Sequence, residues 1–359
     1  MAMSDIICER RGAAGFVLLN RPQALNALNH DMVQGLDAAL EAWAHDPAIE
    51  RVVISGAGGR AFCAGGDIRL MHELGVAGRF DEQLDFYREE YRLNQRIARY
   101  PKPYVALLDG YVMGGGVGVS IHGSHRIAGD KLVFAMPEVS IGFFPDVGAT
   151  FFLPRLPDAT GSYLAVTGAR IGAGDAVALG LATSHVPSAS LAALAQALEA
   201  PGDTDAIIAT FSVPPPPGTL GPHRALIADA FGPGEIAHLL KSLESASAKG
   251  SVFAAETLAL LAAKSPTSVA IGLRQMTEGR SADIEAALRI EFRIVTRICR
   301  MGDFYEGVRA VIIDKDNQPR WSPARLEQVD PAVVEACFAP LGADELTFAE
   351  DLQAGGSGA

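Results

Sequence analysis

Three segments of the sequence carry residue types that could stabilise a negative charge or move a proton. Two are rich in glycine, and the third places two carboxylates eight residues apart. The segments are 62–69 (FCAGGDIR), 113–118 (MGGGVG) and 136–146 (MPEVSIGFFPD). Unobstructed backbone N–H groups at the start of a helix suit a phosphate or a developing oxyanion. Carboxylates suit nucleophilic or general acid–base catalysis.

Short apolar runs and an amphipathic helix would position these segments. Apolar runs at 16–20, 52–55, 105–108 and 132–135 predict buried strands. Apolar residues recur every three or four positions from 29 to 44, which predicts an amphipathic helix. Strands that alternate with helices indicate an α/β fold built from similar units. Both glycine-rich segments are expected to follow a strand and to open a helix.

The character of the chain changes after about residue 190, where Ala- and Leu-rich helical patterns replace the strand signals. A run of prolines at 214–217 predicts a stiff linker or loop. We expect a catalytic α/β core over 1–210 and a mainly helical C-terminal region over 211–345 that packs on it. Residues 346–359 are expected to form a flexible tail.

The composition excludes several classes of function. The chain has 359 residues, of which 49% are hydrophobic and 20% charged, so it can bury a large core. Its 30 basic and 42 acidic residues give a net charge of −12, which argues against a nucleic-acid or anionic-membrane surface. The four cysteines form no CxxC pair, so neither a zinc site nor a redox pair is indicated. Reduced thiols and the lack of an apolar leader segment predict a cytoplasmic protein.

Several residues in or near these segments have ordinary structural explanations. Cys63 lies inside a motif, but a small buried cysteine is more common than a nucleophile, and no histidine is placed to activate it. His122 and His125 are expected on the helix after the glycine run, and no third ligand indicates a metal. The segment 113–118 fails as a dinucleotide fingerprint because Val119 takes the last glycine position.

Taken together, the three segments resemble the crotonase (enoyl-CoA hydratase/isomerase) superfamily. In that family two backbone N–H groups, one from each glycine-rich segment, bind the thioester carbonyl oxygen of an acyl-CoA. The resemblance implies Gly66 and Gly115 as these donors, on a spiral of ββα repeats. A thioester carbonyl gains negative charge when it is attacked, and each aimed donor stabilises that transition state by about 3 kcal/mol.

Within the superfamily, the acidic residues resemble those of the 3-hydroxyisobutyryl-CoA hydrolase subfamily. Hydratases carry a second glutamate three residues after the middle glycine, where this chain has Gly118. The hydrolases instead combine a Pro-Glu pair with an aspartate in an FFPDVG segment, as this chain does. The C-terminal half also resembles that subfamily, through SPTS (265–268), GDF (302–304), EGVRA (306–310) and DKD (314–316).

The resemblance assigns roles to five residues, two of which are the oxyanion donors Gly66 and Gly115. Glu138 attacks the thioester carbon or acts as general base on water, and both routes stay open. Asp146 bonds the substrate hydroxyl or the reacting water, and Glu90 of FYREEY contacts the substrate near its acyl end. The expected substrate is 3-hydroxyisobutyryl-CoA from valine breakdown, with 3-hydroxypropionyl-CoA as a second one.

Two other functions are alternatives at this point: an enoyl-CoA hydratase or isomerase, and a non-catalytic acyl-CoA-binding protein. Thioester hydrolysis needs no metal or redox group, so we expect no cofactor beyond the CoA of the substrate. The CoA phosphates need local cations, for which Arg21, Arg60 and Arg69 lie near the binding loops in sequence. Superfamily members often form trimers or hexamers, so the resemblance is compatible with a homo-oligomer. We expect neither a nucleic acid nor a membrane as partner.

Overall fold

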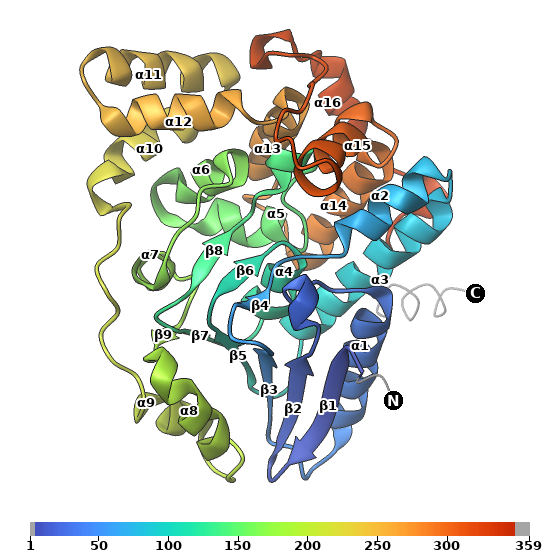
Figure 1. The fold of residues 1–359 in the computed structure, drawn as a ribbon, viewed down its shortest axis with the longest axis vertical. Coiled ribbons are helices and arrows are strands. Elements are labelled where there is room, and N and C mark those ends of the chain that lie inside the picture. The colour runs from blue at the N-terminus through green and yellow to red at the C-terminus, as the bar shows by residue number, and fades with distance from the viewer. Residues whose placement is uncertain (1–3, 349–359) are drawn as a thin grey trace. The chain divides into compact units, whose positions relative to one another are not determined.

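The computed structural model describes residues 4–348 and divides them into two units made of interleaved segments (Figure 1). The sheet unit contains the described residues up to Asp67, together with Leu93–Ala135 and Arg170–Pro222. The helical unit contains Ile68–Arg92, Met136–Ala169 and the described residues from His223 onward. The predicted boundary at 210/211 divides the chain linearly and stays a prediction. Of the predicted tail, 349–359 lie outside the described residues.

The sheet unit holds two sheets (Figure 1). The larger has the order β1-β2-β3-β5-β7-β9, in which β1 is antiparallel to β2 and the other neighbours are parallel. The smaller is parallel, with the order β4-β6-β8. The strands are β1 (Ile6–Arg11), β2 (Ala14–Leu19), β3 (Arg51–Gly56), β4 (Ala61–Cys63), β5 (Tyr104–Leu108), β6 (Tyr111–Met113), β7 (His125–Ala128), β8 (Val133–Ala135) and β9 (Ser184–His185).

After the first hairpin, successive strands enter the two sheets alternately. The strands β3, β5 and β7 join the larger sheet, and β4, β6 and β8 join the smaller one. The helices of this unit are α1 (His30–His45), α4 (Gly115–Ile121), α7 (Ala173–Ala178), α8 (Leu191–Ala197) and α9 (Thr204–Ala209). Asn29 starts α1, because its side chain accepts a hydrogen bond from Met32 N (2.9 Å). The α/β fold with ββα repeats is therefore confirmed.

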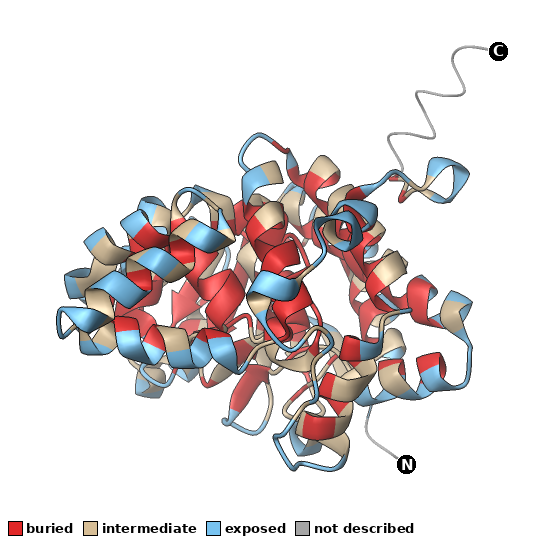
Figure 2. Ribbon diagram, turned by 90° about the horizontal axis from the view of Figure 1, so that it is seen from above, coloured by how far each residue is buried: buried red, intermediate tan, exposed pale blue. Residues whose placement is uncertain are grey.

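The helical unit contains most of the C-terminal half, which confirms its predicted helical character (Figure 1). Its helices carry buried and exposed residues on different sides, as amphipathic patterns require (Figure 2). The helices are α2 (Ile68–Val76), α5 (Ala149–Phe152), α6 (Thr160–Thr167), α10 (Arg224–Phe231), α11 (Ile236–Ala248), α12 (Val252–Ala262), α13 (Pro266–Glu278), α14 (Ile284–Ile298), α15 (Gly302–Val308) and α16 (Pro331–Phe338). Helix α3 (Phe80–Ala98) has residues in both units.

The two histidines after the glycine run are not on one helix, contrary to our expectation. Helix α4 ends at Ile121, His122 is its C-cap, and His125 begins β7. The chain turns at Gly123, where a Cβ would lie only 2.5 Å from the Tyr104 ring. Within residues 4–348 we find no cluster of three or more His, Cys, Asp or Glu that could hold a metal. No helix in the same range is long and apolar enough to cross a membrane.

Candidate active site

The two glycine-rich loops lie next to each other in the sheet unit. They follow β4 and β6, which pair in parallel with Cys63 opposite Val112. A Cβ added to Gly116 would lie 2.3 Å from Cys63 O, and one added to Gly65 would lie 3.7 Å from Met113 O. Because residue 116 has no side chain, the start of α4 can approach the end of β4 this closely.

Both predicted oxyanion donors have an N–H group that no hydrogen bond among the described residues uses. Gly66 lies opposite Leu28 in a parallel β-bridge, whose hydrogen bonds are made by the residues on either side of Gly66. Leu28 N donates to Gly65 O (2.8 Å), and Asp67 N donates to Leu28 O (2.8 Å). Gly115 is the first residue of α4, so its N–H precedes the intrahelical hydrogen bonds. Two such N–H groups beyond neighbouring parallel strands can receive a carbonyl oxygen.

Replacing Gly116 by alanine is expected to lower kcat by about 10²-fold, because the added Cβ moves α4 and the Gly115 N–H away from β4. The matched control is Gly172→Ala in the same unit. There the nearest atom to an added Cβ is Leu132 O at 3.8 Å, and the φ of −97° suits alanine. Steady-state acyl-CoA turnover and thermal unfolding of both variants provide the measurement. Wild-type kcat in Gly116→Ala would contradict the role of these loops.

The helical unit buries the three carboxylates that the motifs single out. Glu138 begins the short 3₁₀ helix η2 (Glu138–Ile141), Asp146 follows the GFFP turn, and Glu90 lies on α3. Their exposed fractions are 6%, 5% and 2%. The Tyr91 hydroxyl, also on α3, donates a hydrogen bond to Asp146 Oδ2 (2.9 Å). Tyr91 was missed by sequence reasoning, although it belongs to the FYREEY segment.

Burial raises the pKa of each of these carboxyl groups. The pKa of Asp146 rises to about 7, although the hydrogen bond from Tyr91 acts in the opposite direction. Burial first, and then the negative charge of Asp146, hold the pKa of Glu138 well above its usual range. The same two causes, with Glu291 as a third, raise the pKa of Glu90. A group of carboxyls that retains protons near neutral pH is suited to acid–base chemistry.

Two further buried residues hold the loop that carries Asp146. Glu291 on α14 accepts hydrogen bonds from Gly148 N (2.7 Å) and Thr150 N (2.8 Å). Gln275 on α13 donates to Pro145 O and to Thr150 Oγ1 (2.7 Å). Both side chains are fully buried. They fix the backbone on each side of Asp146, and sequence reasoning missed both of them.

A signal for Glu291 exists in the sequence. It occupies a position on the apolar face of α14, between Leu288 and Val295 and beside Phe292, all of which are buried. A carboxylate at a core position of an amphipathic helix needs partners, because an unpaired buried charge is costly. The sequence cannot name those partners, since they lie about 140 residues away in the chain.

The free energy of unfolding is expected to fall as the pH rises from about 5 to 8. Burial raises the pKa of Glu291 to about 8 and that of Asp146 to about 7, so the folded state holds protons that the unfolded chain releases above pH 4–5. The stabilisation from each group is therefore fully present at low pH and is lost as the pH rises to the pKa of that group in the folded state. Over this range each group lowers the free energy of unfolding by up to about 1.4 kcal/mol per pH unit. Urea unfolding across this range measures it. Glu291→Gln should make the free energy of unfolding depend less steeply on pH. An unchanged dependence would contradict the raised pKa of Glu291.

Three buried polar atoms near these carboxyls have no hydrogen-bond partner among the described residues: Tyr87 Oη, Glu90 Oε1 and Glu138 Oε2. The Tyr87 ring stacks on Phe143 with 5.6 Å between centroids. Buried polar atoms in native proteins are normally satisfied by protein, water or ligand. These atoms therefore mark a place where polar groups of a substrate or water can bind.

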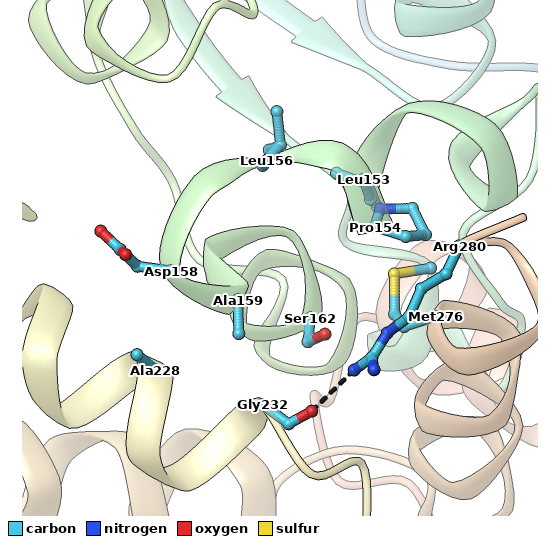
Figure 3. Close-up of a pocket in the computed structure, with 10 residues that line it drawn as sticks. All are labelled: Leu153, Pro154, Leu156, Asp158, Ala159, Ser162, Ala228, Gly232, Met276 and Arg280. Atoms are coloured by element: carbon cyan, nitrogen blue, oxygen red, sulfur yellow. Dashed lines mark hydrogen bonds between the residues drawn. The ribbon is translucent and has the colours of Figure 1, made fainter.

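Two cavities of the helical unit are lined by residues other than the candidate site residues. One of about 250 Å³ lies against α6, where Arg280 donates to Gly232 O (2.7 Å) (Figure 3). A larger one, of about 660 Å³, is lined by residues that include Asp303 and Arg320. None of the site residues singled out from the sequence lines either cavity.

The three arginines considered for the CoA phosphates differ in their surroundings. Arg21 forms an ion pair with Asp67 (2.8 Å), and Arg69 donates to Ile312 O (3.0 Å). Arg60 is exposed, and its side chain makes no hydrogen bond or ion pair with another described residue, although its backbone O accepts from Tyr111 N (3.2 Å). Of the three, Arg60 can therefore bind a phosphate without giving up a protein partner.

The sequence matches the model of the enoyl-CoA hydratase/isomerase family over residues 14–338. The chain belongs to this family. Within the family, the chain is similar to proteins named as hydrolases. The chicken (Gallus gallus) protein "3-hydroxyisobutyryl-CoA hydrolase, mitochondrial" is 41% identical over 353 residues, which cover 96% of this chain and 91% of that protein. The human (Homo sapiens) protein of the same name is 40% identical over 357 residues, covering 97% and 92%. The predicted resemblance to the hydrolase subfamily is confirmed.

Solved structures of the family share the fold over nearly the whole chain. A carnitinyl-CoA dehydratase from Mycobacterium thermoresistibile superposes with a TM-score of 0.91 at 38% identity, covering 97% of this chain and 99% of the other. An enoyl-CoA hydratase from Rhodobacter sphaeroides 2.4.1 gives 0.90 at 44% identity, covering 96% and 100%. The fold, including the helical C-terminal region, is therefore that of known family members.

The predicted cytoplasmic location is wrong by this comparison, because the hydrolase relatives bear the name mitochondrial. The physical reason is that reduced cysteines and the lack of a long apolar segment do not separate the two compartments. All four cysteines are indeed free in the structure.

Proposed function

We propose that this protein hydrolyses 3-hydroxyisobutyryl-CoA to 3-hydroxyisobutyrate and CoA. The observation that carries the proposal is the buried pair Glu138 and Asp146. The glutamate that hydratases carry three residues after the middle glycine is Gly118 in this chain. The hydrolase relatives, which match over nearly the full length, support the same reaction.

In the proposed mechanism, the N–H groups of Gly66 and Gly115 bind the thioester oxygen and stabilise the negative charge that develops on it. The Glu138 carboxylate either attacks the carbonyl carbon, giving a mixed anhydride that water cleaves, or removes a proton from the attacking water. In both routes the C–S bond breaks, the sulfur takes a proton, and one water is consumed. Both routes require Glu138 to be deprotonated when it reacts.

The acyl group is recognised in this proposal by the acidic residues of the helical unit. Asp146 accepts from the substrate hydroxyl or orients the water, and Glu90 contacts the acyl end. The 3-hydroxyisobutyryl group has the branched skeleton that valine leaves after loss of its amino group and carboxyl carbon, so we place the reaction in valine breakdown. No cofactor takes part in the proposed steps, and the CoA moiety enters with the substrate.

An enoyl-CoA hydratase is the second candidate, because similar solved structures bear hydratase and dehydratase names. Water addition by two carboxylates needs a partner for Glu138, and residue 118 is glycine. The two activities are separated by release of CoA thiol from 3-hydroxyisobutyryl-CoA and by loss of enoyl absorbance from crotonyl-CoA. We expect thiol release, with slower turnover of 3-hydroxypropionyl-CoA. Crotonyl-CoA hydration without thiol release would reject the proposal, as would CoA binding without any turnover.

The proposal includes a homo-oligomer, either a trimer or a hexamer, as in many superfamily members. Light scattering of the purified protein at several concentrations measures its molar mass. A monomer at every concentration would reject this part and leave the proposed reaction unaffected.

A further inference from the structure

The C-terminal SPTS motif packs on the turn that carries Glu138. Ser265 N donates a hydrogen bond to Val139 O (3.0 Å), inside η2. Lys264 Nζ donates to Ser140 Oγ (2.9 Å). Two consecutive residues before α13 thus contact two consecutive residues of the turn.

Ser265 is also joined to the GDF motif. Its hydroxyl donates to Asp303 Oδ2 (2.7 Å) and accepts from Ser268 N (3.2 Å), so Ser265 is the N-cap of α13. Asp303 Oδ1 accepts from Ser322 N (2.9 Å). Ser265 is fully buried, and Asp303 is 8% exposed. Asp303 therefore connects three segments that are far apart in the sequence.

Helix α15 makes close backbone contact with the end of the same turn. A Cβ added to Gly307 would lie 2.3 Å from the carbonyl carbon of Ile141. A Cβ added to Gly142, whose φ is +69°, would lie 2.1 Å from Asp303 O. Glycine is required at both positions, and the two contacts leave the turn no space to move towards α15.

The Glu138 carboxyl group accepts a hydrogen bond from the backbone N–H of its own residue. No group among the described residues donates to its Oε2 atom. The direction of the carboxylate therefore depends on the backbone of η2, and the backbone depends on the contacts from α13 and α15. A displacement of about 1 Å at a reacting group can cost about 10²-fold in rate.

We propose that Ser265 and Asp303 are positioning residues for the reaction: Ser265 N holds η2 through Val139 O, and Asp303 holds Ser265 in place, so that the Glu138 carboxylate keeps its direction. The inference rests on the proposed function, in which Glu138 reacts. It gives a catalytic reason for the SPTS and GDF motifs, through which the C-terminal half resembles the hydrolase subfamily. A purely structural cap predicts a lower unfolding temperature with kcat unchanged.

The experiment compares Ser265→Ala and Asp303→Ala with Ser251→Ala. Ser251 is the matched control, since it is also a helix N-cap of the helical unit, bonded to Ala254 N (3.2 Å). We expect the first two variants to lower kcat by at least about 10-fold, with KM changed by less than about 3-fold. Ser251→Ala should lower the unfolding temperature and keep the wild-type kcat. All assays are run well below the unfolding transition of each variant.

Asp303→Asn provides a rescue, because its amide oxygen can accept from Ser322 N while its amide nitrogen donates to Ser265 Oγ. We expect it to recover most of the kcat that Asp303→Ala loses. Wild-type kcat in Ser265→Ala and Asp303→Ala, with only the unfolding temperature lowered, would overturn the inference. If Asp303→Ala does not fold, Ser265→Ala decides. Glu138→Gln is measured in parallel. Wild-type turnover by Glu138→Gln would reject the proposed function itself. An inactive Glu138→Gln together with a fully active Ser265→Ala would reject the positioning role alone.

Discussion

Glu138→Gln is expected to lower kcat for 3-hydroxyisobutyryl-CoA by about 10³-fold or more. Glutamine has the size of glutamate, but its amide can neither attack the thioester carbon nor take a proton from water. Thiol release, measured at saturating substrate, gives the effect on kcat. Because the substitution leaves the oxyanion donors of the sheet unit in place, a residual rate above that in buffer is expected.

The same variant should fold at least as well as the wild type. Burial keeps the pKa of Glu138 well above its usual range, so the folded protein already favours an uncharged side chain at this position. Thermal unfolding at pH 8 tests this point. Glu244→Gln, at an exposed position of α11, is the matched control and should change neither quantity. Near-normal turnover by Glu138→Gln would contradict the mechanism.

Asp146→Asn is expected to lower kcat/KM for 3-hydroxyisobutyryl-CoA by about 10²-fold. The amide keeps an oxygen that can accept from Tyr91, whose hydroxyl lies 2.9 Å from Asp146 Oδ2, so the loop should hold its place. The substrate hydroxyl or the reacting water, however, loses a charged acceptor. An acyl-CoA without the hydroxyl separates these two roles. Asp146→Asn should lower kcat/KM for that substrate only if Asp146 acts on the water.

The substitution should also shift the pH dependence of kcat/KM. The charge of Asp146 is the second cause of the raised pKa of Glu138, after burial. Removing that charge lowers the pKa of Glu138, so the rise of activity with pH should move to lower pH. A pH profile from 5 to 9 measures the shift. A profile that stays in place, or moves to higher pH, would contradict the interaction between the two carboxyls.

Much of the fold could be predicted from local patterns. The runs at 16–20, 52–55, 105–108 and 132–135 are observed as β2, β3, β5 and β8, with ends that differ by at most two residues. Strands were also expected before both glycine-rich segments, where β4 and β6 lie, whereas β7 and β9 were not predicted. The expectation for His125 was wrong because α4 stops after Ile121, where the backbone must approach Tyr104 at Gly123.

Some residues of the candidate site could be predicted from the sequence, and others could not. Short motifs in the sequence point to Gly66, Gly115, Glu138 and Asp146, because the roles proposed for these residues depend on residue types close together in sequence. Gln275, Glu291 and the Ser265–Asp303 pair act on loops more than 100 residues away or through each other. Helical periodicity marks such positions as buried, but it does not say which polar atoms they meet. Their partners could be found only from the folded chain.

The most direct measurement identifies the products formed from 3-hydroxyisobutyryl-CoA by mass spectrometry. This substrate separates the candidate reactions, because a hydrolase breaks the C–S bond and a hydratase working in reverse removes water to give an unsaturated acyl-CoA. Our account predicts equal amounts of 3-hydroxyisobutyrate and free CoA, with loss of both in Glu138→Gln. Accumulation of the unsaturated acyl-CoA, with the thioester intact, would contradict it.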